Sequence, residues 1–109
     1  MSSAMTSAVW ELDLSPDYKF LLLELAFRAN DEGRVQWGPP DYMSLMCSVT
    51  RPVAQKILRD FVESGVLVVE TSDTTSGQPV MCRLDLTKAV ALPPPKRRSR
   101  RGLRTRKGG

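Results

Sequence analysis

The chain contains no histidine and only two cysteines, and these scarcities exclude most metal-site and catalytic chemistry. Four zinc ligands of the usual kinds cannot be assembled from the isolated Cys47 and Cys82 without recruiting carboxylates. The sequence also lacks a glycine-rich phosphate loop, a nucleophile elbow and a carboxylate pair in a known motif. We therefore expect no metal, no cofactor, no small-molecule ligand and no enzymatic activity.

Long apolar runs are missing as well. No stretch of about 18 apolar residues occurs, so we expect no membrane-spanning helix. The first ten residues have neither a basic start nor a continuous apolar segment, so we expect no signal peptide. Two unpaired cysteines are typical of a reducing compartment. These absences predict a cytoplasmic protein, and 109 residues leave room for one domain.

Charge is distributed unevenly along the chain. Residues 1–92 carry eight basic and twelve acidic residues, a net charge of −4, whereas residues 93–109 carry eight basic residues and no acid, a net charge of +8. The eight basic residues of this tail are Lys96, Arg97, Arg98, Arg100, Arg101, Arg104, Arg106 and Lys107. The tail has almost no apolar residues to bury, so we predict that it is disordered. It could bind DNA phosphates, bind RNA or an acidic protein, or serve solubility; basic blocks of this density favour nucleic acid.

The remainder of the chain predicts a flexible N-terminus over residues 1–9 and one domain over residues 10–92. Within the domain we expect an extended segment at 10–14, helices at 16–30, 41–47 and 50–64, and strands at 35–37, 66–70 and 80–86. Ser15 and Thr50 are suitable N-caps, and Gly65 is a suitable helix stop. The pattern therefore predicts a mainly α fold with three helices and a small β-hairpin.

The first expected helix has an apolar stripe that is wider than one core face requires. Phe20, Leu23 and Phe27 extend the arc formed by the other apolar residues of this helix. Either Trp10 and Leu12 cover the extension, or a second copy of the chain does, which would make the protein a homodimer. Because the aromatic side chains occupy periodic apolar positions, we expect them in the core rather than as base-stacking platforms; they are Trp10, Phe20, Phe27, Trp37 and Phe61.

Two short helices joined by a tight turn and followed by a β-hairpin form the winged helix-turn-helix arrangement. The sequence resembles the winged helix-turn-helix domains of phage and plasmid replication proteins and related small regulators, over roughly residues 10–70. The matching segments are Leu14-Ser15-Pro16, Lys19 to Leu23, Ala29 to Gly33, Trp37, Val49-Thr50-Arg51 and Glu63 to Leu67. Ser48 stands where that family usually has a glycine in the turn between the two helices.

This resemblance implies sequence-specific binding of double-stranded DNA, with the helix at 50–64 in the major groove and the basic tail on the phosphate backbone. The candidate contacts in the domain are Thr50, Arg51, Gln55, Lys56, Arg59 and, on the return strand, Arg83. Arginine and lysine suit guanine edges, glutamine suits adenine, and threonine suits phosphate. The hairpin loop at 71–79 carries only Asp73 as a charge, so it is a poor phosphate clamp.

The role implied is that of a mobile-element protein associated with the nucleoid: a transcriptional regulator, or an accessory factor for replication or partition. A domain this small reads few base pairs, so we expect two copies on repeated or palindromic sites. The alternative is a protein-interaction domain whose basic tail binds RNA or an acidic partner. The acidic domain favours that alternative, as do Asp60 and Glu63 beside the expected reading face.

Overall fold

The computed structural model describes residues 3–94, so the eight basic residues of the tail lie outside the described residues. The elements, in chain order, are α1 (Ser3–Trp10), α2 (Pro16–Arg28), β1 (Arg34–Gln36), α3 (Pro40–Cys47), α4 (Arg51–Ser64), β2 (Leu67–Ser72), β3 (Pro79–Leu84) and the 3₁₀ helix η1 (Leu86–Ala91). The expected class, mainly helical with a small β component, is confirmed. The β component is larger than a hairpin, because β1 joins it.

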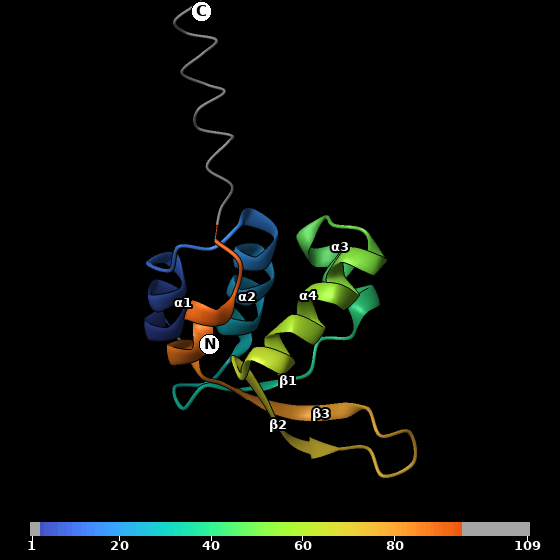
Figure 1. The fold of residues 1–109 in the computed structure, drawn as a ribbon. Helices are drawn as coiled ribbons and strands as arrows, with labels where there is room; N and C mark the ends of the chain where they lie inside the picture. Colours follow the sequence, from blue (N-terminus) through green and yellow to red (C-terminus); the bar gives the residue numbers. More distant parts are fainter. Residues whose placement is uncertain (1–2, 95–109) are drawn as a thin grey trace, which may run out of the picture.

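The sheet is antiparallel and has the strand order β1-β3-β2. Figure 1 shows the sheet along the lower edge of the molecule, with the helices on one side of it and the β2–β3 hairpin projecting beyond them. Cys82 is paired with Val35 on one side and with Val69 on the other, so these three side chains share the face that the helices cover.

The core lies between α2, α4 and this covered face. Leu21, Leu22 and Leu25 of α2 are fully buried, as are Ile57, Leu58 and Phe61 of α4. The ring of Tyr18 meets the ring of Phe61 edge to face, with centroids 6.1 Å apart. The buried face of α4 therefore points toward α2 and the sheet, and its opposite face points to solvent.

The N-terminal prediction was wrong. Residues 3–10 form α1 rather than a loose segment, and α1 packs against α2. Val9 is fully buried, while the small serine and alanine residues around it lie at the surface. A short helix of this kind is stabilised by tertiary packing rather than by its own propensity, so its small, polar composition was misleading.

Three of the five aromatic side chains expected in the core are at the surface. Trp10, Phe20 and Phe27 are 59%, 54% and 49% exposed, whereas Phe61 is buried and Trp37 is partly buried against the core. Trp10 ends α1 instead of belonging to an extended segment, so Val9 rather than Trp10 fills the space beside α2. The periodic stripe of α2 therefore belongs to two surfaces, one buried and one open.

The C-terminal end of the domain lies beside the start of α2. After β3, the helix η1 buries Ala89, and Leu92 follows it into the core. The Ser15 N–H then donates to the Pro93 carbonyl across 3.4 Å, which places the last described residues next to the start of α2. No helix among residues 3–94 is long and apolar enough to cross a membrane.

Candidate nucleic-acid interface

The turn between α3 and α4 is tightly constrained. Ser48 adopts the left-handed conformation, with φ 56° and ψ 40°, and its N–H donates to the Ser44 carbonyl. The Ser44 hydroxyl crosses the turn and donates to the Val49 carbonyl at 2.5 Å. Thr50 then caps α4, because its side-chain oxygen accepts from the Val53 N–H at 3.4 Å. These contacts fix the direction in which α4 leaves the turn.

The solvent face of α4 presents two polar side chains that have no partner. Gln55 and Arg59 are exposed and lie one helical turn apart, on the side opposite Ile57 and Phe61. Neither forms a hydrogen bond or an ion pair with any other residue between 3 and 94. Glu63 follows one turn after Arg59 and is also exposed. The N-terminal half of this face is therefore polar and acid-free, and its C-terminal end is acidic.

Arg51, the first residue of α4, pairs with the first turn of α3. Its Nε lies 2.6 Å from Oδ1 of Asp41, and the two side chains are 64% and 77% exposed. An ion pair this open to water contributes little free energy and is readily exchanged for another anion. Arg51 is therefore available to a phosphate that approaches the α3–α4 turn.

Lys56 lies on the flank of α4 and contacts α2. Its Nζ lies 3.0 Å from Oδ2 of Asp60 and donates at 3.0 Å to the Tyr18 hydroxyl, which itself donates to the same Asp60 oxygen at 2.5 Å. Burial and the hydrogen bond to Asp60 raise the pKa of Tyr18, and the hydrogen bond from Tyr18 lowers the pKa of Asp60. Lys56 is thus engaged within the fold, and the structure does not group it with Gln55 and Arg59.

Arg83 lies on a different face. It stands between the buried Cys82 and Leu84 on β3, so its side chain points away from the helices. Its Nε is 3.6 Å from Glu70 Oε2, and the other oxygen of Glu70 is 3.1 Å from Nε of Arg34, which is directly opposite Arg83 across the sheet. The structure therefore separates Arg83 from the α4 face. Arg34 is the neighbour that sequence reasoning missed, since only the β1–β3 pairing reveals it.

The hairpin loop offers hydroxyl groups rather than charge. Asp73 accepts from the Thr75 N–H at 3.0 Å and from the Ser76 hydroxyl at 2.9 Å, and these bonds lower the pKa of Asp73. Gly77 completes the turn with φ 75°. The one acid of the loop is therefore used to close it, and the exposed side chains around it are small and polar.

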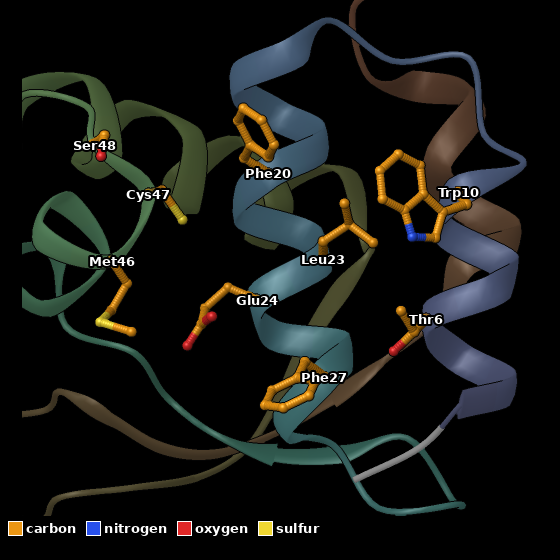
Figure 2. A pocket seen from close by; sticks show the side chains of 9 residues that line it. All are labelled: Thr6, Trp10, Phe20, Leu23, Glu24, Phe27, Met46, Cys47 and Ser48. Carbon is orange, nitrogen blue, oxygen red and sulfur yellow. The ribbon is translucent and has the colours of Figure 1, made fainter.

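A second surface feature lies on the side of α2 that faces away from α4. Phe20, Leu23 and Phe27 of α2 form the floor of a groove with a volume of about 460 Å³. Trp10 on α1 and Met46 on α3 stand on its two sides, as Figure 2 shows. Sequence analysis found the three α2 residues but not Met46, because nothing in the α3 sequence indicates that it meets α2.

The remaining lining of the groove carries little free charge. Glu24 is the charged residue among the described lining residues, and it accepts a hydrogen bond from the Tyr42 hydroxyl at 3.1 Å and pairs with Arg28 at 3.4 Å. Burial raises the pKa of the Cys47 thiol, which keeps it neutral. The groove therefore suits an apolar occupant.

Comparisons with protein-family models, with curated proteins and with solved structures find no match to this chain. Within residues 3–94, no group of three or more histidine, cysteine, aspartate or glutamate side chains is arranged to hold a metal ion.

Proposed function

We propose that this protein is a sequence-specific double-stranded DNA-binding protein with a winged helix-turn-helix fold. The order of α2, β1, α3, α4 and the β2–β3 hairpin, with the strand order β1-β3-β2, supports this assignment. In it, α3 and α4 are the helix-turn-helix, and the hairpin is the wing. The role in the cell would be that of a regulator, or of an accessory factor for replication or partition, at the nucleoid.

The observation that carries the proposal is the pair of free polar side chains on α4. A helix fits the major groove, where arginine reads guanine and glutamine reads adenine through paired hydrogen bonds. Gln55 and Arg59 have this chemistry and no competing partner among residues 3–94, and the constrained turn before α4 fixes their direction. Gln55 and Arg59 have no bond within residues 3–94 to give up before they meet a base edge, whereas Lys56 would first have to leave Tyr18 and Asp60.

The other candidate residues take supporting roles in this proposal. Thr50 and Arg51 lie at the start of α4, where a phosphate beside the major groove would approach them. Lys56 holds α4 against α2, and Arg83 faces away from the duplex that α4 reads. Pro93 lies beside Asp60 and Glu63 at the far end of α4, and Pro94, the last described residue, lies beside Leu12 and Leu14. In this proposal the basic tail follows the phosphate backbone of the same duplex.

The test is to select bound sequences from a random duplex library and to measure competition by scrambled duplex. Gln55→Ala and Arg59→Ala should each weaken binding to the selected duplex by about 1–3 kcal/mol while leaving the folded state intact. Arg83→Ala removes the same charge as Arg59→Ala from a different face, the outer side of the sheet, so it is the matched control. It should leave the discrimination between selected and scrambled duplex unchanged. If wild type, Gln55→Ala and Arg59→Ala discriminate equally between selected and scrambled duplex, α4 is not the helix that reads the DNA.

The second candidate function is a protein-interaction domain, and the groove favours it. The domain has a net charge of −4, so its surface outside the α4 face and the tail would repel DNA. The groove, in contrast, is apolar and open, as a surface that binds another protein would be. Such a domain would show no competitor-resistant binding to any selected duplex. If DNA binding is found instead, the genomic positions of the selected sites would show whether the protein acts at promoters, at origins or at partition sites.

A further inference from the structure

We propose that the groove over α2 binds a second copy of this chain, so that the protein is a dimer with two outward-facing α4 helices. The floor residues Phe20, Leu23 and Phe27 are spaced by three and four positions, which is the spacing of a helix-packing seam. Leu23 lies near the middle of this seam. A two-fold axis near Leu23 therefore sets the Phe20 end of one groove opposite the Phe27 end of the other, as a two-fold interface requires.

The exposed area agrees with what a stable dimer needs. Trp10, Phe20, Phe27 and Met46 are each about half exposed, and a large side chain exposed to this extent leaves about 100 Å² open. Together they supply about 400 Å² per chain, which is half of the roughly 800 Å² that each partner buries in a standard interface. The apolar share of such interfaces is also a little over half.

The charged residues at the groove are compatible with a second copy of the chain as its occupant. Glu24 is already paired with Tyr42 and Arg28, so its carboxylate would keep its partners under a second copy. Lys19 donates to the Trp10 carbonyl at 2.9 Å, and its Nζ lies 5.4 Å from the centroid of the Trp10 ring, which fixes α1 as a side of the groove. A strongly charged partner would find nothing complementary here, whereas the same groove in another copy is equally apolar.

The position of the groove decides how the dimer is arranged. In Figure 1, α1 lies to the left of α2 and α3 to the right; in Figure 2, which looks into the groove, this order is reversed and α4 lies behind α2. The groove and the outer face of α4 are therefore on opposite sides of the domain. A two-fold dimer through the groove leaves both α4 faces accessible and directs them away from each other.

The experiment is sedimentation of the full chain without DNA, which makes the result independent of the proposed function. The wild type should sediment as two chains of 12.2 kDa at micromolar concentration. Phe20→Glu combined with Phe27→Glu should raise the dissociation constant on the order of 100-fold or more. Val90→Glu is the control, because Val90 is 93% exposed and lies outside the groove. A wild type that stays monomeric, or a double variant that stays dimeric, would overturn the proposal.

A second measurement does not depend on folding of the charged variants. In a Trp37→Phe background, iodide should quench Trp10 fluorescence less as protein concentration rises, since the second copy covers Trp10. Quenching that is unchanged over the concentration range in which the mass doubles would place the interface elsewhere. A monomer whose groove is covered only when another protein is added would assign the groove to that protein and would also overturn the proposal.

Discussion

At the scale of single residues, the cations of this domain divide according to their partners. Lys56, Arg83 and Arg34 are paired with partly buried acids, whereas the partner of Arg51 is the largely exposed Asp41. Arg59 and Lys88 form no ion pair within residues 3–94, and the uncharged Gln55 forms no side-chain hydrogen bond there. Residue type alone does not separate these groups, since lysine and arginine have the same phosphate chemistry wherever they lie. The difference is the acid within reach of each side chain.

The Tyr18–Lys56–Asp60 cluster makes a prediction for Tyr18→Phe. Removing the hydroxyl should lower the free energy of unfolding by about 1–2 kcal/mol at neutral pH, because Asp60 loses a partly buried donor and keeps only Lys56. The pKa of Asp60 is lowered in the folded protein, so its stabilisation is present above the ordinary carboxyl pKa and is lost as pH falls below about 4. The loss caused by Tyr18→Phe should therefore shrink in acid.

Urea unfolding of wild type and variant at pH 7 and at pH 3 measures this difference. Tyr42→Phe is the matched control, since Tyr42 donates to Glu24 and does not touch Asp60. An NMR titration should show a higher Asp60 pKa in Tyr18→Phe and an unchanged one in Tyr42→Phe. An Asp60 pKa that is insensitive to Tyr18→Phe would contradict the role given to the cluster.

At the scale of elements, the α3–α4 turn shows how a local strain is tolerated. Ser48 occupies a left-handed conformation that favours glycine, the residue found there in the family that the sequence resembles. The cost of a side chain in this conformation is about 1 kcal/mol. The hydrogen bond from Ser44 to Val49 and the cap at Thr50 hold the turn in place despite it.

Ser48→Gly should accordingly raise the free energy of unfolding by up to about 1 kcal/mol, because it removes the backbone strain. The gain is reduced by the greater conformational entropy of the unfolded glycine variant. The same change at Ser7, an exposed position inside α1, should lower the free energy of unfolding by about 0.5–1 kcal/mol. Thermal unfolding of the two variants would show opposite shifts. Destabilisation by Ser48→Gly equal to that by Ser7→Gly would indicate that the turn is not strained.

At the scale of the whole molecule, opposite charges lie in the domain and in the tail. The domain has a net charge of −4 and cannot attract DNA over a long range, whereas the tail brings eight cations within a dozen residues. In the proposed function, the tail supplies affinity and α4 supplies discrimination.

Truncation before Lys96 tests this division of roles. If half of the tail cations engage phosphates, the slope of log affinity against log salt should fall by about 3–4. The ratio of affinities for the selected and the scrambled duplex should change much less, because phosphate contacts carry little sequence information. If the tail enters a narrow A·T minor groove, a preference for A·T-rich flanks should be lost as well. Equal slopes for the two chains would mean that the tail has another partner.

The opposed α4 faces of the proposed dimer give a further prediction. A dimer of this shape cannot place both α4 helices on one side of a straight duplex, so it should hold two duplexes rather than one palindromic site. An immobilised duplex should capture a second, labelled duplex through the wild type. Phe20→Glu combined with Phe27→Glu should still bind the immobilised duplex but capture none. A wild-type dimer that binds DNA without capture would show that the two α4 faces are not opposed.

Local signals in the sequence determined the class of the fold and most of its elements. Thr50 and Gly65 act through residues within four positions of themselves, so the start and the end of α4 were predictable. Ser15 occupies the N-cap position of α2 as expected, but its side chain forms no cap hydrogen bond, and Pro16 marks the start of the helix. The alternation around Cys82 likewise placed a strand. The wide stripe on α2 was also visible, although which half of it is buried was not.

Only the tertiary structure decided which polar side chains are paired within the fold and which are free to bind a partner. Lys56 meets Tyr18 across 38 positions of sequence, and Arg83 meets Arg34 and Glu70 through strand pairing. Val9 rather than Trp10 fills the space beside α2, because α1 docks in one orientation out of several that its composition permits. Such choices depend on packing between distant segments, whose energies no local window of sequence contains.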